Sequence, residues 1–159
     1  ALRNREIDVG LALLPPDVDD IEVETLIEQG FCIATAARSG PANLNPVALA
    51  HFKDECFVAT PRSQSPGLEN MKDRMFREAD FTPNVVQYAA QPLTLLALVA
   101  ADVGILLCPE VMSKVKYDGV AFVPVASPHR VCLGMITRRN DQKSQVLINF
   151  CKLALATSQ

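Results

Sequence analysis

The chain has 159 residues, of which 49% are hydrophobic, 21% are charged and 6% are aromatic, and its formal net charge is -3. This composition excludes an intrinsically disordered chain, and the length suffices for a sizeable core without disulfides or metal ions. The 18 acidic and 15 basic residues form no basic cluster, so we expect that this segment alone does not bind nucleic acid.

The five cysteines stand singly, each inside or beside an apolar run: Cys32, Cys56, Cys108, Cys132 and Cys151. The sequence has no CxxC pair and no histidine at ligand spacing, which argues against a disulfide framework and against a metal site. We therefore expect five buried free thiols in a cytoplasmic protein. The longest apolar stretch, residues 92–101, is far shorter than the ~20 residues that cross a membrane, and the N-terminus lacks a signal pattern.

Short and almost continuously apolar runs predict strands that are buried on both faces. These runs are residues 7–14, 31–37, 56–60, 104–108 and 131–137. The segment 84–90 predicts a further strand. Polar residues before Pro46, Pro66 and Pro92 predict three helix starts, because a proline in the first helical position loses no hydrogen bond.

Three segments have helical patterns. In residues 66–79 the apolar positions share one stripe, formed by Leu68, Met71, Met75 and Ala79. The charged residues take the other faces: Glu69, Lys72, Asp73 and Arg77. This pattern predicts a surface helix. Residues 92–101 are apolar all round and predict a fully covered helix, whereas residues 142–156 predict a terminal helix with one apolar stripe.

The order of these elements predicts an α/β protein with two lobes. Strands and helices alternate from Phe31 to Cys108, which is typical of a layered α/β lobe. The first and last strands form a second sheet, which the chain reaches through crossovers at 21–30 and 118–125. We therefore expect mostly parallel sheets, with residues 1–30 and 118–159 in lobe I and residues 31–117 in lobe II. A ligand cleft is expected at the lobe boundary.

Several segments, taken in order, resemble the effector-binding domain of LysR-type bacterial transcriptional regulators. The resemblance is carried by LRNREIDVGLALLPP (2–16), residues 81–90, LVAADVGILLCPE (98–110) and the closing helix, and it covers nearly the whole chain. It implies the periplasmic-binding-protein fold and an inducer-sensing function. Asp102 stands where the family usually has glycine, in a turn that aspartate tolerates better than most residues.

The resemblance also implies that the chain is a fragment. The family's helix-turn-helix, its linker helix and the first strand, helix and second strand of its effector domain have no counterpart in this sequence. DNA binding would then require the missing N-terminal domain, and residues 7–14 would present an exposed apolar edge. The family forms homodimers or homotetramers, so we expect one of these states.

The candidate ligand site is the turn Thr60–Pro61–Arg62–Ser63, together with Gln91. Each follows a predicted strand and precedes a predicted helix, where hydroxyls, a guanidinium and free helix N–H groups favour a small anion such as an organic acid. Leu13 is a candidate for the cleft floor in the other lobe. In the alternative interpretation Ser65 and Gln91 are helix caps, Arg62 is solvated and Leu13 is ordinary core.

The sequence shows no catalytic set and no cofactor motif. His51 and His129 are interpreted as structural or surface residues, and cysteines in apolar runs are poor nucleophiles. We therefore expect a binding module and not an enzyme. A periplasmic-type solute-binding protein is the main alternative, and an enzyme on the same fold is a weaker one.

Overall fold

The computed structural model of the protein describes residues 2, 4–14, 21–38, 46–138 and 144–157. The chain forms two compact units, one of Ala1–Glu28 with Val131–Gln159 and the other of Gln29–Arg130. The predicted loops 15–20 and 39–45 lie outside the described residues. Residues 118–130, which we expected in the first lobe, belong to the second unit because their strand pairs with the middle of its sheet.

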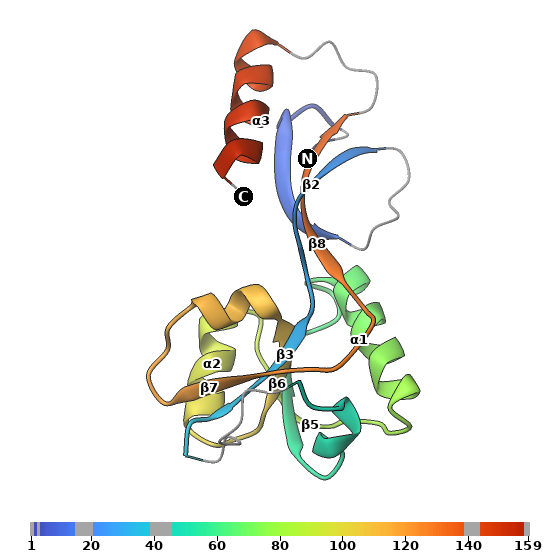
Figure 1. Cartoon of the computed structure of the whole chain (residues 1–159), viewed down its shortest axis with the longest axis vertical. Helices are drawn as coiled ribbons and strands as arrows, with labels where there is room; N and C mark the ends of the chain where they lie inside the picture. Colours follow the sequence, from blue (N-terminus) through green and yellow to red (C-terminus); the bar gives the residue numbers. More distant parts are fainter. Residues whose placement is uncertain (1, 3, 15–20, 39–45, 139–143, 158–159) are drawn as a thin grey trace. The chain divides into compact units, whose positions relative to one another are not determined.

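The first unit contains a three-stranded sheet and a helix (Figure 1). Its elements are β1 (Val9–Leu14), β2 (Ile21–Gln29), β8 (Val131–Arg138) and α3 (Gln145–Thr157). The strand order is β1-β8-β2, and β1 pairs antiparallel with β8, with Leu13 opposite Leu133. In the described part of this sheet β1 lies at the edge, and its Leu11 side chain is 59% exposed. The exposed apolar edge expected at 7–14 is therefore present among the described strands.

The second unit contains a three-stranded sheet in the order β6-β3-β7, a two-stranded sheet of β4 and β5, and two long helices. Its elements are β3 (Phe31–Ala36), η1 (Leu49–Phe52), β4 (Cys56–Ala59), α1 (Pro66–Glu78), β5 (Asn84–Tyr88), α2 (Pro92–Ala100), β6 (Leu106–Pro109), η2 (Glu110–Lys114) and β7 (Val120–Pro124). Two of the three prolines expected at helix starts, Pro66 and Pro92, begin α1 and α2. The helix start expected at Pro46 is wrong, because the next residue, Val47, forms a parallel bridge with Val125.

The strand directions of this unit follow from its pairings. β4 pairs parallel with β5, and an isolated parallel bridge from Phe57 to Ile105 connects β4 to the segment that leads into β6. β3 pairs antiparallel with both β6 and β7. These pairs, like β1 with β8, depart from the mostly parallel sheets that we expected. β3 follows β2 of the first unit after the single residue Gly30.

In the second unit, α2 lies on one side of the strands and α1 lies on the other (Figure 1). On one face, Leu95, Leu96 and Val99 of α2 pack into a buried cluster with Cys32 and Cys108. Full coverage of α2, which we expected, is wrong, since Leu93 at its start is 60% exposed. A helix packed on one sheet face buries only the side chains that point at the sheet, whatever the character of the others.

Two local expectations concern the cysteines and Asp102. Cys56 at the start of β4 is exposed, whereas Cys32, Cys108, Cys132 and Cys151 are buried free thiols as expected. The apolar run around Cys56 buries the next two residues and leaves the strand start open. Asp102 adopts a left-handed φ of 61° and pairs with Arg38 at 2.8 Å, so aspartate does occupy the demanding turn after α2.

Candidate functional site

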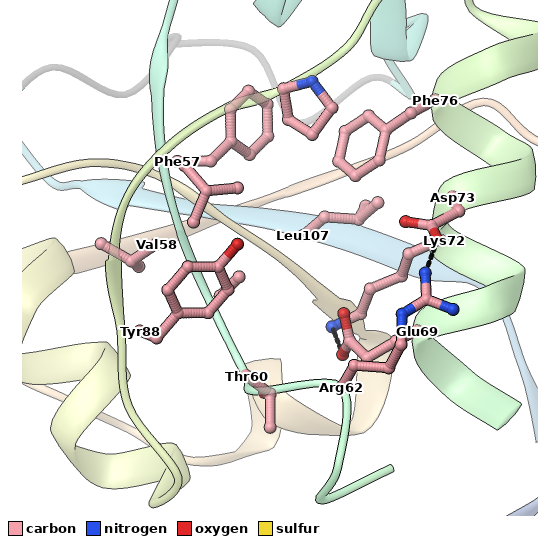
Figure 2. Close-up of a pocket in the computed structure, with 13 residues that line it drawn as sticks. Phe57, Val58, Thr60, Arg62, Glu69, Lys72, Asp73, Phe76, Tyr88 and Leu107 are labelled. Atoms are coloured by element: carbon pink, nitrogen blue, oxygen red, sulfur yellow. Dashed lines mark hydrogen bonds and ion pairs between the residues drawn. The ribbon is translucent and has the colours of Figure 1, made fainter. Parts of the chain in front are cut away.

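A cavity of about 140 Å³ lies in the second unit between α1 and the strands β4 and β5 (Figure 2). Its apolar wall is formed by Phe57, Val58, Ala59, Phe76, Pro83, Val85, Tyr88 and Leu107. Its polar wall is formed by Thr60, Arg62, Glu69, Lys72 and Asp73. Thr60 and Arg62 come from the turn predicted as a ligand site, and the other polar residues come from α1.

Phe57 and Phe76 line the cavity, and Phe81 packs against both of them. The rings of Phe57 and Phe76 meet edge to face with centroids 5.3 Å apart, and Phe76 meets Phe81 at the same centroid distance. Edge-to-face pairs of this kind add to the stabilisation from burial alone. They hold α1 against β4, and they fix the width of the space between the helix and the strand.

The turn at residues 60–63 is positioned by the end of β4 and the start of α1. Thr60 and Pro61 are half-buried, whereas Arg62 and Ser63 are exposed. The guanidinium of Arg62 donates hydrogen bonds to Asn70 and to Asp73 on α1. Arg62 is therefore neither simply solvated nor an unpaired cation, because a carboxylate already balances its charge.

Glu69 and Lys72 form a buried ion pair on the cavity side of α1. Lys72 Nζ lies 2.8 Å from Glu69 Oε1, and the side chains of lysine and glutamate are only 6% and 11% exposed. Our expectation that both residues lie on the outer faces of this helix is wrong. The buried residues are Glu69, Lys72, Met75 and Phe76. Two opposite charges three positions apart compensate each other, which allows a face that reads as polar to be buried.

The remaining predicted site residues lie away from this cavity. Gln91 is exposed at the start of α2 and makes no side-chain cap, and it does not line the cavity. Leu13 is half-buried in β1 of the first unit. Ser65 also makes no side-chain cap at the start of α1. Roles for Gln91 and Leu13 in ligand binding stay predictions.

The cavity combines an apolar body with a balanced polar end, which suits binding more than chemistry. No group of three or more histidine, cysteine or acidic side chains that could hold a metal ion occurs among the described residues. His129 lies 2.6 Å from the carboxylate of Glu78, outside the cavity lining. Within the described ranges, no helix has the length and apolar character that a membrane crossing requires.

The family to which this chain belongs follows from its match to a family model. Residues 1–158 match the family model described as the LysR substrate binding domain. The chain belongs to this family. Its curated relatives include HTH-type transcriptional regulators. The transcriptional regulator CatR of Pseudomonas putida is 23% identical over 147 residues, which cover 92% of this chain and 50% of CatR.

Solved structures of LysR effector-binding domains have the same fold. The effector-binding domain of QuiR in complex with shikimate superposes with a TM-score of 0.82 at 22% identity, covering 99% of this chain and 74% of that one. The BenM effector-binding domain with its effector benzoate has a TM-score of 0.78 at 24% identity, covering 98% of this chain and 71% of that one. The α/β, periplasmic-binding-protein-like fold class expected from the resemblance is confirmed. The chain spans about half or less of the length of the curated relatives that it matches.

Proposed function

We propose that this chain is the inducer-sensing part of a LysR-type transcriptional regulator. A small molecule binds at the Thr60–Ser63 turn and in the cavity beside it, and the resulting change is passed to a separate DNA-binding domain. Binding has a regulatory effect only if the ligand prefers one of two arrangements of the protein, with a coupling of typically ~1 to 3 kcal/mol.

The observation that carries this proposal is the cavity itself. It opens beside the predicted turn, in a member of a family whose solved relatives QuiR and BenM hold shikimate and benzoate. Its polar end and apolar body are the features of a small-molecule site. No catalytic role is proposed, since the cavity lining offers no histidine or cysteine to serve as base or nucleophile.

The proposed partners follow from the family and from the composition. We propose a homodimer or homotetramer, which size-exclusion chromatography with light scattering tests directly. With a net charge of -3 the chain itself is not proposed to bind DNA. The free thiols favour the cytoplasm. An organic acid as effector has less support than the sequence suggested, because Arg62 is paired with Asp73.

A ligand screen followed by one cavity-filling variant tests the site. Small ring-sized molecules are screened by the rise in melting temperature, since a ligand that binds only the folded state stabilises it. The best hit is then titrated into the chain and into Val85→Phe, whose larger side chain occupies the cavity. We expect the variant to melt normally and to lose the ligand. Equal affinity in both proteins would place the ligand elsewhere.

The gene context tests the coupling to transcription. A helix-turn-helix encoded upstream of this segment supports a regulator. A signal peptide in its place would favour the alternative of a solute-binding protein of the same fold.

A further inference from the structure

The buried ion pair of Glu69 and Lys72 lies at the cavity, although an ion pair that only stabilised the fold could lie elsewhere. Both side chains line the cavity, and their 2.8 Å contact lies at its polar end (Figure 2). Burial of two charges is costly, and a pair of apolar residues would hold α1 against the sheet equally well. The pair is therefore a candidate for recognising the ligand that enters the cavity.

The charges around the cavity sum to zero. Arg62 and Lys72 supply two positive charges, and Glu69 and Asp73 supply two negative charges. Each cation is already in contact with one carboxylate, Arg62 with Asp73 and Lys72 with Glu69. A ligand with a net charge would add a charge that no residue of the lining balances, in a space partly removed from water.

The hydrogen-bonding capacity of the pair is only partly used. An ammonium group has three donors, and Lys72 uses one of them for Glu69 in the described part of the chain. The Glu69 carboxylate likewise can accept more than the one hydrogen bond that it receives from Lys72. Donors and acceptors thus lie next to each other at the polar end. A neutral group with an acceptor and a donor on neighbouring atoms matches both.

The size of the cavity limits the rest of the ligand. A volume of about 140 Å³ is close to the ~150 Å³ of an apolar protein cavity that binds benzene. Phe57, Phe76 and Leu107, which line it, are all buried and supply an apolar surface for one ring. The space is too small for a two-ring molecule that is fully enclosed.

We propose that this cavity selects an uncharged, single-ring molecule with an adjacent hydrogen-bond acceptor and donor, such as a primary carboxamide. The carbonyl oxygen accepts from Lys72 Nζ, and the amide N–H donates to the Glu69 carboxylate. This inference rests on the proposed function, because it names the ligand class of the same site. It replaces the organic acid suggested by Arg62 alone.

Three probes that share one ring test the ligand class. Benzamide is neutral, benzoate is an anion and benzylammonium is a cation, and each is titrated into the full chain by calorimetry. We expect benzamide to bind at least about tenfold more tightly than either ion. The double variant Glu69→Leu/Lys72→Met keeps the shape of the pair and removes its charges. It should keep the melting temperature and weaken benzamide binding about tenfold or more.

Two control variants separate the ligand class from the site. Arg77→Met removes an exposed charge from the same helix, away from the cavity, and should leave benzamide affinity unchanged. Val85→Phe fills the cavity and leaves the ion pair in place, so it should abolish benzamide binding.

Each remaining outcome overturns a defined part of the inference. Tighter binding of benzoate than of benzamide, abolished by Val85→Phe, would overturn the neutral ligand class and leave the site of the proposed function intact. Benzamide binding that survives Val85→Phe would overturn the site as well. Failure of all three probes to bind at millimolar concentration would overturn selection for a single ring.

Discussion

Cys32 and Cys108 lie directly opposite each other on β3 and β6, and their Sγ atoms are 3.7 Å apart in the buried cluster under α2. The contact with Cys108 and burial both raise the pKa of the Cys32 thiol. The Cys32 thiol therefore keeps its proton in the folded chain, and the main consequence is for stability in alkaline solution.

Stability should fall with pH above the ordinary thiol pKa of about 8.5. Below that pH the folded and unfolded chains both keep the Cys32 proton, so its contribution to stability is fully present. Above it the unfolded chain loses a proton that the folded chain keeps, which lowers the unfolding free energy by about 1.4 kcal/mol per pH unit. Urea denaturation across this range should show a steeper decline for the parent than for Cys32→Ala. Equal slopes would contradict the raised pKa.

Native thiol labelling should modify one cysteine quickly. Cys56 is exposed, whereas the other four cysteines are buried and require opening of the structure before they react. Brief treatment with iodoacetamide followed by mass spectrometry should therefore give a single adduct at Cys56, and the same treatment in urea should give five. A second adduct at equal rate under native conditions would show that a buried site opens readily.

Removing one partner of the Glu69–Lys72 pair should lower the unfolding free energy strongly, whereas replacing both partners should change it little. Lys72→Met leaves the Glu69 carboxylate buried without its partner, and we expect a loss of about 3 kcal/mol of unfolding free energy or more. Glu69→Leu/Lys72→Met removes both charges and should be close to the parent in stability. Chemical denaturation of the three proteins measures both effects. A single variant as stable as the parent would mean that water reaches Glu69 freely.

Gly104 should not accept a side chain. A Cβ at this position would lie 2.8 Å from the backbone oxygen of Cys56, which Ile105 N also contacts at 2.8 Å, so the strand cannot move away easily. We expect Gly104→Ala to cost about 2 kcal/mol through overpacking. Gly67→Ala, in the first turn of α1, should be neutral or stabilising by up to about 1 kcal/mol. Thermal melting distinguishes the two, and similar melting temperatures would contradict the steric conflict.

Arg62 should matter less for binding than its position in the turn suggests. Its guanidinium and the Asp73 carboxylate are 59% and 43% exposed, so Arg62→Ala should cost less than about 1 kcal/mol of stability. Because Asp73 already balances its charge, ligand affinity should fall less than about threefold. Thr60→Val should cost about two- to tenfold if the hydroxyl contacts the ligand. A loss of tenfold or more in Arg62→Ala would show that the guanidinium leaves Asp73 to bind an acid.

The strands and helix starts were predictable from sequence because they rest on local signals. Runs of apolar residues predicted β3, β4, β6 and β8, and the prolines at 66 and 92 marked α1 and α2. The turn at Thr60 and Arg62 was found in the same way, from its place between a strand and a helix. Each of these signals depends on neighbouring residues only.

The rest of the site depends on partners that a hydrophobic pattern does not show. The sequence pattern predicts that Glu69 and Lys72 face outward, because each is a charged residue. Only the ion pair between them allows both side chains to be buried. The outer face of α2 read as covered because its residues are apolar, although nothing in the described structure buries Leu93. The place of β7 in the second unit follows from its pairing with β3, which is far away in sequence.

The central place of β3 also has a consequence for synthesis on the ribosome. Every residue of β3 is buried, yet Cys32 is translated 76 residues before Cys108, its partner on β6. At ~5 to 20 residues per second, the strand waits roughly 4 to 15 s for its first neighbour in the sheet. During that time a six-residue apolar segment is open to chaperones and to other nascent chains. Chains stalled before β6 should therefore be chaperone-bound or aggregated, whereas chains stalled after β7 can complete this sheet.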